Sequence, residues 1–368
     1  MRAAPVVRRV LAAALAAAAL AACSPGPGAT PDAPGSTPSA SDTPEASSTT
    51  PPPEVAASAE EPPTVTLAVV GDVMLGRGVA AAHADPTVTM RAMRPLLRRA
   101  DITIGTLEST LSTDGSPTQG GDSFAADPGV LDGLAAAGFD ALSLANNHVG
   151  DYGQRALLRT LEAFRGSGIA RFGAGRDLAA ATRPAVVERD GVRVGLLGFN
   201  AIGETPRATP TTPGALSVRM PPRTGPLQPA DLRHVLAAVR RLDRRVDVVV
   251  VLPHWGTQYT HRPEPVQRLV GRRLVDAGAD LVVGGHPHWV QSVERHRGAT
   301  IAHSLGNFVF DMDFMEQTME GVVLTATITG DRVVDVALAP YRMDATFTPR
   351  PLRGAAAREV LADVRSGG

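Results

Sequence analysis

Lysine is absent from the 368 residues of this chain, and cysteine occurs once. Without lysine the chain can supply neither a P-loop lysine for phosphate nor a lysine Schiff base. A single cysteine excludes an internal disulfide and any zinc site built from several thiolates. Arginine therefore carries all of the basic charge, and the 36 basic residues nearly balance the 37 acidic ones, for a net charge of −1. This balance argues against nucleic acid as a partner.

The single cysteine follows a short apolar segment near the amino terminus. Arginines precede an uninterrupted run of Val, Leu and Ala from Val10 to Ala22, and Cys23 comes next. The run has about 13 residues, whereas a membrane-spanning helix needs about 20, so the pattern favours a signal peptide with a lipobox. We therefore predict that residues 1–23 are a lipoprotein signal peptide and that Cys23 is lipidated. The protein would then sit at the extracellular face of the cell membrane. The alternative is an ordinary signal peptide, cut nearby, and a freely secreted product.

Residues 24–63 consist of Pro, Ser, Thr, Ala, Gly and acidic residues, with Val55 as the only large aliphatic residue. This composition cannot bury a hydrophobic core, so we predict a disordered tether. A single domain is expected over residues 64–350, followed by a tail at 351–368.

From Thr64 onward, short β-branched runs alternate with amphipathic stretches, which indicates an α/β fold. Strands are predicted at Thr64–Val70, Ile102–Thr106, Ala141–Leu144, Val192–Gly198, Val246–Leu252, Leu281–Val283 and Thr300–His303. Helices are predicted at Met90–Arg99, Gly129–Ala137, Gln154–Arg165, Ala230–Leu242 and Pro265–Asp276. Hairpin turns at Asp190-Gly191 and Gly330-Asp331 make the sheet mixed rather than purely parallel. The segment Gly203–Pro226, rich in Pro, Thr and Arg, is a surface insertion that could overhang a site.

Unusual polar residues follow five of the predicted strands, at the carboxyl ends where ligands bind in open α/β sheets. They are Asp72, Glu108, Asn146, Asn147, His148, His254, His286 and His288. A mixed set of imidazole nitrogens and carboxylate oxygens suits a divalent transition metal such as Zn, Mn or Fe better than Mg or Ca. Gly71, Gly284 and Gly285 fit places where the backbone must come close to a ligand.

Taken singly, each of these residues also has a plain structural interpretation. An aspartate after a strand is usually a turn or a helix cap, and one histidine alone is more often structural than a ligand. We assign a structural role to the remaining histidines, which are His83, His234, His261, His296 and His303. The pair in Gly285-His286-Pro287-His288 and the joint pattern of the strand ends are what indicate a metal site.

At these positions the sequence resembles the CapA-type family of bacterial capsule synthesis proteins, which is associated with poly-γ-glutamate. The domain of that family looks like the calcineurin-like metallophosphoesterases, a sandwich of mixed sheets in α-β-β-α layers. The similarity covers roughly residues 65–312. The matching stretches are Gly71-Asp72-Val73-Met74-Leu75-Gly76-Arg77, Leu107-Glu108, Leu144-Ala145-Asn146-Asn147-His148, Asp151-Tyr152-Gly153, His254-Trp255-Gly256, Gly285-His286-Pro287-His288 and Ser304-Leu305-Gly306-Asn307-Phe308.

The resemblance implies roles for individual residues. Asp72, Asn147, His254, His286 and His288 would be metal ligands, and Glu108 would stand where a bridging aspartate is usual. His148 would be the proton donor or transition-state stabiliser. Arg77, Asn146 and Asn307 are expected to contact the substrate, although Arg77 could equally be a surface residue. Met74 occupies a position where the broader pattern has a histidine ligand. The number of firmly bound metals, one or two, therefore stays open.

Two classes of function follow from this sequence. In the first, the metal activates water and polarises an acyl or phosphoryl group while His148 transfers a proton, which makes the chain a hydrolase of an anionic cell-envelope polymer or its precursor. In the second, the chain is a non-catalytic anchoring or assembly factor that binds such a polymer. The fold alone does not decide between them.

Overall fold

The computed structural model describes residues 61–366. The predicted signal peptide at 1–23, with Cys23, and the predicted tether as far as residue 60 lie outside the described residues. Across 61–366, no helix combines the length and the apolar character needed to cross a bilayer.

The first sheet has eight strands, and parallel strands form one half of it. β1 (Thr64–Val73), β2 (Ile102–Leu107), β3 (Ala141–Ser143) and β4 (Ala170–Phe172) run parallel in this order, and β13 (Asn307–Val309) pairs with the end of β1. On the other side of β1, the sheet continues through antiparallel strands, which are β14 (Glu320–Thr329), β15 (Arg332–Met343) and β16 (Pro349–Pro351). The sheet is therefore mixed.

The second sheet has six strands, and its inner strands are also parallel. Its order is β11 (Val293–His296), β12 (Ala299–Ala302), β10 (Leu281–Val283), β9 (Val248–His254), β7 (Val192–Asn200) and β6 (Ala185–Arg189). A separate ribbon pairs β5 (Ala174–Gly175) with β8 (Gly214–Ala215). Both predicted hairpins form, joining β6 to β7 and β14 to β15, and the left-handed backbone falls on Asp190, Gly191 and Gly330.

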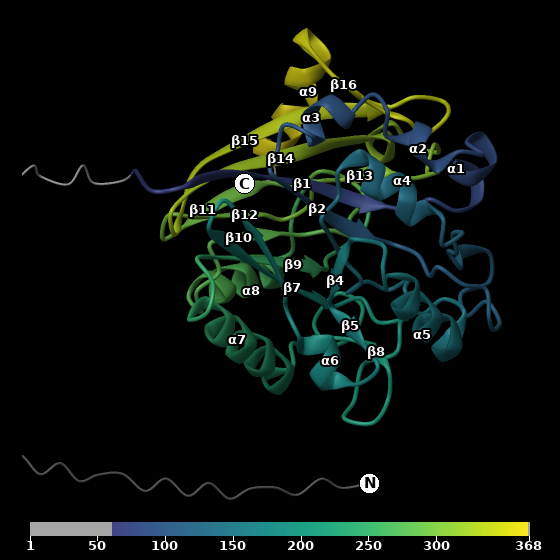
Figure 1. Ribbon diagram of the computed structural model, residues 1–368, viewed down its shortest axis with the longest axis horizontal. Helices are drawn as coiled ribbons and strands as arrows, with labels where there is room; N and C mark the ends of the chain where they lie inside the picture. Colours follow the sequence, from purple (N-terminus) through teal and green to yellow (C-terminus); the bar gives the residue numbers. More distant parts are fainter. Residues whose placement is uncertain (1–60, 367–368) are drawn as a thin grey trace, which may run out of the picture. The chain divides into compact units, whose positions relative to one another are not determined.

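The alternation of apolar residues explains why the two sheets face each other. In β1, Leu67 and Val69 enter the core shared with the second sheet, whereas Ala68 and Val70 face the opposite side. Each such buried aliphatic side chain contributes about 1.5–3 kcal/mol relative to exposure. Helices α4 (Val130–Ala137) and α5 (Gly153–Ala163) cover the outer face of the first sheet, and α7 (Pro229–Asp243) and α8 (Pro265–Val275) cover that of the second (Figure 1). The predicted α-β-β-α sandwich of mixed sheets is confirmed.

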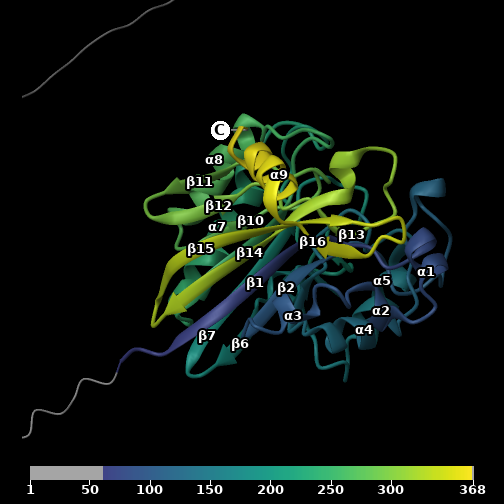
Figure 2. The same ribbon diagram turned by 90° about the horizontal axis from the view of Figure 1, so that it is seen from above.

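The helices near the start of the domain are short. They are α1 (Arg77–Ala82), α2 (Pro86–Thr89) and α3 (Arg94–Leu97), with the 3-10 turn η1 (Gly120–Asp122) after β2. Figure 2 shows α1, α2, α4 and α5 gathered on one side of the first sheet. The continuous helix predicted over Met90–Arg99 is wrong, because only α3 forms there. Pro95 lacks the N–H that would continue the ladder of helical hydrogen bonds.

The chain after residue 350 packs on the domain. A second 3-10 turn, η2 (Glu316–Met319), leads into β14, and after β16 residues Gly354–Ser366 form α9. Val360 and Val364 of α9 are buried in the core between the sheets. The domain therefore extends through α9 and is longer than the 64–350 segment expected before a tail at 351–368, where amphipathic spacing in a short Ala- and Arg-rich stretch gave a weak signal.

Candidate metal centre

The carboxyl ends of the parallel strands in both sheets converge on one buried cluster. Each side chain arrives from the last residues of a strand or from the turn directly after it. Asp72 lies in β1 and His254 ends β9, while the others follow β2, β3 and β10. The structure brings together all six predicted ligands, which are Asp72, Glu108, Asn147, His254, His286 and His288.

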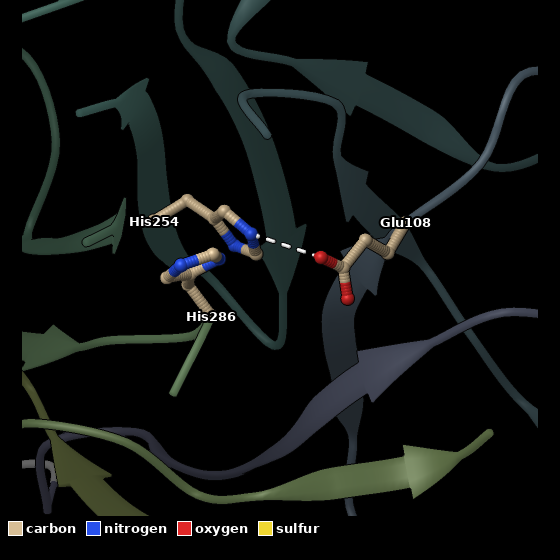
Figure 3. Close-up of side chains that lie close together, drawn as sticks. All are labelled: Glu108, His254 and His286. Atoms are coloured by element: carbon tan, nitrogen blue, oxygen red, sulfur yellow. Dashed lines mark hydrogen bonds and ion pairs between the residues drawn. The ribbon is translucent and has the colours of Figure 1, made fainter. Parts of the chain in front are cut away.

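Glu108 occupies the centre of this cluster. The ligand atoms of Glu108, His254 and His286 lie within 4.8 Å of one another, and so do those of Asp72, Glu108 and His288. Figure 3 shows the rings of His254 and His286 beside each other, with the carboxylate of Glu108 facing His254. Because Glu108 belongs to both groups, it would be a shared ligand if both groups held a metal.

His254 links the two sheets across the cluster. Its Nε2 lies 3.0 Å from Glu108 Oε1 and 2.9 Å from Asn147 Oδ1, and its Nδ1 lies 3.8 Å from Asp72 Oδ1. One ring nitrogen has a single hydrogen to share between two oxygens. A cation held between the nitrogen and the two oxygens would satisfy all three atoms at once.

Unpartnered polar atoms concentrate at the same place. Within the described residues, these buried atoms of the cluster have no hydrogen-bond partner: Asp72 Oδ1, Glu108 Oε2, His254 Nδ1, His286 Nδ1 and Nε2, and His288 Nε2. Buried polar atoms in native proteins are nearly always satisfied, so a group of them requires an explanation. A divalent metal fits, because each atom is a nitrogen or oxygen donor of the kind that Zn, Mn and Fe bind.

Burial shifts the pKa values of the cluster toward neutral forms. It raises the pKa of Asp72 to about 7, helped by the charge of Glu108, and raises the pKa of Glu108 to about 8. It lowers the pKa of His254 to about 4 and that of His288 to about 3, and the pKa of His286 falls well below its ordinary value. The histidines are thus neutral at physiological pH, which is the form that binds a metal.

The backbone after β10 is held in an uncommon conformation. His286 has φ +96° and His288 has φ +59°, a region that costs residues other than glycine roughly 1–3 kcal/mol. His286 N donates to Asp72 Oδ2 at 2.9 Å, which fixes the turn against β1. A Cβ on Gly285 would stand 2.4 Å from Asp72 Oδ1, so only glycine allows this approach. Gly71 and Gly284 instead approach protein backbone, Gly306 O and His303 O.

His148 lies beside the cluster and is anchored on its far side. Its Nδ1 is 2.7 Å from Asp151 Oδ2, which also accepts from the backbone N–H of Phe124 at 2.6 Å. The ring stacks on Phe124 with centroids 3.8 Å apart, and its Nε2 lies 4.0 Å from Glu108 Oε1. One nitrogen is therefore fixed by a carboxylate, and the other faces the candidate ligands.

Asn146 and Asn307 were expected to contact the substrate, but the structure gives them positioning roles. Asn146 Nδ2 donates to Leu107 O at 2.7 Å, and its Oδ1 accepts from two backbone N–H groups of its own turn. Asn307 Oδ1 lies 2.8 Å from His288 Nδ1, and its Nδ2 donates to Thr318 O at 2.9 Å. Both side chains are fully buried, so their amides orient neighbouring residues and offer no free atom to a substrate.

Arg77, the third residue expected to contact the substrate, is committed elsewhere. Its guanidinium forms an ion pair with Asp311, with Nε donating to Oδ2 at 3.1 Å. It also lies over the ring of Phe124, 4.3 Å from the centroid. Since His148 stacks on the same ring, Phe124 separates Arg77 from His148. Met74 is likewise no ligand, because it is buried in the core and its sulfur accepts from Gly76 N.

Asp151 and Glu204 had no predicted role, yet both contact the site. Asp151 could have been found from its i, i+3 spacing to His148 within a motif. Glu204 comes from the Gly203–Pro226 insertion, and its Oε2 accepts from Asn147 Nδ2 at 2.8 Å. Glu204 also forms an ion pair with Arg223 of the same insertion. No local sequence pattern marks Glu204.

The remaining histidines lie outside the cluster. Four of them form hydrogen bonds to other parts of the domain: His83, His234, His261 and His296. His303 is buried, and its Nε2 lies 3.8 Å from Glu294 Oε1.

The model of the family described as bacterial capsule synthesis protein PGA_cap matches residues 66–312. The chain belongs to this family. The matched range agrees with the resemblance predicted over residues 65–312. The match contains all six candidate ligands of this PGA_cap domain, together with His148.

Relatives of this PGA_cap protein occur in several bacteria. It is 34% identical over 254 residues to a capsule biosynthesis protein CapA of Bacillus anthracis, which covers 67% of this chain and 60% of that protein. It is 32% identical over 248 residues to a PGA biosynthesis protein CapA of Bacillus subtilis, and the alignment covers 66% of this chain and 62% of that protein. A probable polyglutamine synthesis accessory protein of Mycobacterium tuberculosis is 30% identical over 297 residues, and the alignment covers 69% of this chain and 77% of that protein. The chain thus spans about three fifths of the two Bacillus proteins.

Among solved structures, NAD nucleotidase of Haemophilus influenzae aligns with a TM-score of 0.44 and 11% identity, over 83% of this chain and 63% of that one. We infer nothing from a similarity this weak.

Proposed function

We propose that this chain is a metal-dependent hydrolase that cleaves a phosphoester or amide bond in an anionic cell-envelope polymer or its precursor. One observation carries the proposal: Asp151 fixes Nδ1 of His148 while Nε2 faces the buried ligands. A site that only binds a metal needs ligands but no neighbouring imidazole held ready to transfer a proton. General acid–base catalysis does need such a group.

The residues would divide the work as follows. Asp72, Glu108, Asn147 and the three histidines of the cluster would hold one or two divalent ions of Zn, Mn or Fe. When bound, such a metal supplies a Lewis acid that lowers the pKa of water and polarises the bond to be cleaved. His148 Nε2 would give a proton to the leaving group, and the carboxylate of Asp151 would stabilise the charged ring.

The substrate class and the location are supported by the family and by the amino terminus. The names of the Bacillus relatives refer to capsule and PGA biosynthesis, which supports an anionic envelope polymer as the partner. A lipid on Cys23 would hold the domain at the extracellular face of the membrane. A near-neutral net charge gives no support to nucleic acid as the substrate.

A non-catalytic anchoring or assembly role is the second candidate, and the burial of the cluster favours it. Each of the six candidate ligands is at most 3% exposed. A polymer would then have little access to the metal, and the ion would stabilise the fold around a binding surface.

Metal analysis combined with an activity screen tests the proposal. The purified protein should contain a transition metal and should hydrolyse either a phosphoester or a γ-glutamyl amide substrate, with activity lost on chelation and restored by the metal. His148→Ala is the matched control, because it removes the proton donor but none of the candidate ligands. If a metal-loaded protein hydrolyses neither class of substrate, the anchoring role is the better assignment.

A further inference from the structure

Two pockets lined by arginine lie apart from the metal centre. The first, about 720 Å³, lies between the second half of α5, the segment from β4 to β5, and α6 (Leu178–Thr182). Four arginines line it: Arg165, Arg171, Arg176 and Arg183.

The second pocket, about 450 Å³, lies between α6 and the end of α7. Arg241, Arg244 and Arg245 line it, and no carboxylate does. Pro184 lines both pockets, so the two adjoin at this residue, and Figure 1 shows α6 between α5 and α7. We call this surface, defined by the seven arginines, the arginine groove.

The positive charge of the arginine groove is largely uncompensated. The first pocket has two acidic residues, Glu162, which pairs with Arg165 at 2.9 Å, and Asp177, which accepts from Ala180 N at the start of α6, so the seven arginines outnumber the carboxylates. Within residues 61–366, the six other arginines of the groove form no ion pair with a carboxylate. Burial, and then the neighbouring guanidiniums, lower the pKa of Arg171. The near-zero net charge of the chain therefore conceals a basic surface.

This surface is separate from the metal centre. The two share no residue, and α5 connects them. α5 begins at Gly153, two residues after Asp151, and the groove contacts its second half from Leu158 onward. The part of α5 before the groove is about 8 Å long at 1.5 Å per residue.

We propose that the arginine groove binds a linear polycarboxylate as an extended chain. Guanidinium groups pair with carboxylates through two parallel hydrogen bonds, and a row of them suits a polymer with regularly spaced carboxylates. Phe164 is the only aromatic residue that lines either pocket, and it is buried. The groove thus has no exposed aromatic side chain on which the bases of a single-stranded nucleic acid could stack. The inference rests on the proposed function for the identity of the polymer, but on neither the metal nor hydrolysis.

Binding of a fluorescent γ-linked glutamate oligomer of about 20 units tests the proposal, measured by anisotropy in metal-loaded and metal-free protein. The variant is Arg176→Glu/Arg183→Glu/Arg241→Glu. The control carries the same charge change at exposed arginines elsewhere, Arg99→Glu/Arg273→Glu/Arg358→Glu. We expect the groove variant to weaken binding by about tenfold or more and the control by less than about threefold. Affinity of the unmodified protein should fall as salt rises, as for other polyanions.

Three other outcomes would overturn the proposal. Equal weakening in both variants would show unspecific charge attraction. Equally tight binding of an oligothymidylate of the same length would show a nucleic-acid surface. Binding that disappears in metal-free protein but survives in the groove variant would place the polymer at the metal centre alone. Conversely, specific binding by a protein without hydrolase activity would support the groove and count against the proposed hydrolase.

Discussion

His148 and Asn147 are neighbours in the chain, yet they contact different parts of the site. Asn147 Oδ1 points at His254 within the ligand cluster, whereas His148 is held by Asp151 outside it. We predict that His148→Ala keeps the metal and lowers turnover by about 10²- to 10⁴-fold, the usual contribution of general acid–base catalysis. Asn147→Ala should lower both metal content and rate. Metal analysis and steady-state kinetics of the two variants distinguish these effects. If His148→Ala loses metal as completely as a ligand variant, His148 is itself a ligand.

The histidines after β10 contribute to different halves of the cluster. His286 belongs with Glu108 and His254, whereas His288 belongs with Asp72 and Glu108. The protein should contain about one equivalent of metal, rising toward two when both positions fill. His286→Ala and His288→Ala should each reduce this content, because water replaces an imidazole poorly. His234→Ala is the control, because it removes a histidine outside the cluster and should leave the metal content unchanged. Full retention of metal in both ligand variants would exclude the site.

At the scale of elements, the insertion after β7 supports the turn after β3. Glu204 accepts from the amide of Asn147, which leaves the oxygen of that amide facing the cluster. Outer residues that orient ligands typically affect metal affinity by about 10- to 100-fold. We predict that Glu204→Ala lowers metal affinity by this factor. Glu204→Gln should lower it much less, because glutamine keeps an acceptor oxygen. Metal titration checks both variants. Equal affinity in all three proteins would show that Asn147 needs no such support.

The strands and their ends could be predicted from the sequence because the information there is local. The β-branched run Val248–Leu252 favours a buried strand, and residues that follow parallel strands gather at the carboxyl ends, which predicted that Asp72, Glu108 and His254 lie close together. The structure places the strands of Asp72 and His254 in two different sheets. Contacts made by insertions and side-chain amides are long-range. Asn307 looks like a substrate contact until β13 pairs with β1 and directs it to His288. The arginine groove could not be predicted from charge along the sequence, because its members follow α5, lie in β4, flank α6 and lie at and just after the end of α7.

At the scale of the whole domain, the buried cluster makes stability depend on pH and metal. In metal-free protein, the raised pKa values of Asp72 (about 7) and Glu108 (about 8) mean that the folded state holds protons that the unfolded chain releases above about pH 4. Stability therefore falls as pH rises from about 4 to about 8. The lowered pKa values of His254 and His288 act in the opposite direction below about pH 6.5, because only the unfolded chain then takes up protons.

We therefore predict that metal raises the melting temperature more at pH 8 than at pH 6, because the metal replaces the protons that these carboxylates must release. Differential scanning calorimetry with and without metal measures the difference. Metal-free Glu108→Gln should lose less stability between pH 6 and pH 8 than metal-free wild type, since it carries no carboxyl to ionise. A metal effect that is independent of pH would count against carboxylate ligands.

The last prediction for the whole molecule concerns Cys23, which lies outside the described residues. The short apolar run before Cys23 is too short to span a bilayer as a helix, so membrane association should depend on the lipid. In a bacterial host that processes lipoproteins, Cys23→Ser should move the protein from the membrane fraction to the soluble fraction or the medium.

Deletion of residues 24–60 is the matched control, and it should leave the protein on the membrane. The melting temperature should stay nearly unchanged, because the deletion stops before Pro63, whose carbonyl accepts from Gly330 N at 2.8 Å. If Cys23→Ser remains in the membrane fraction as fully as wild type, the apolar run is an uncleaved anchor. If the deletion lowers the melting temperature by many degrees, the segment packs on the domain and is no simple tether.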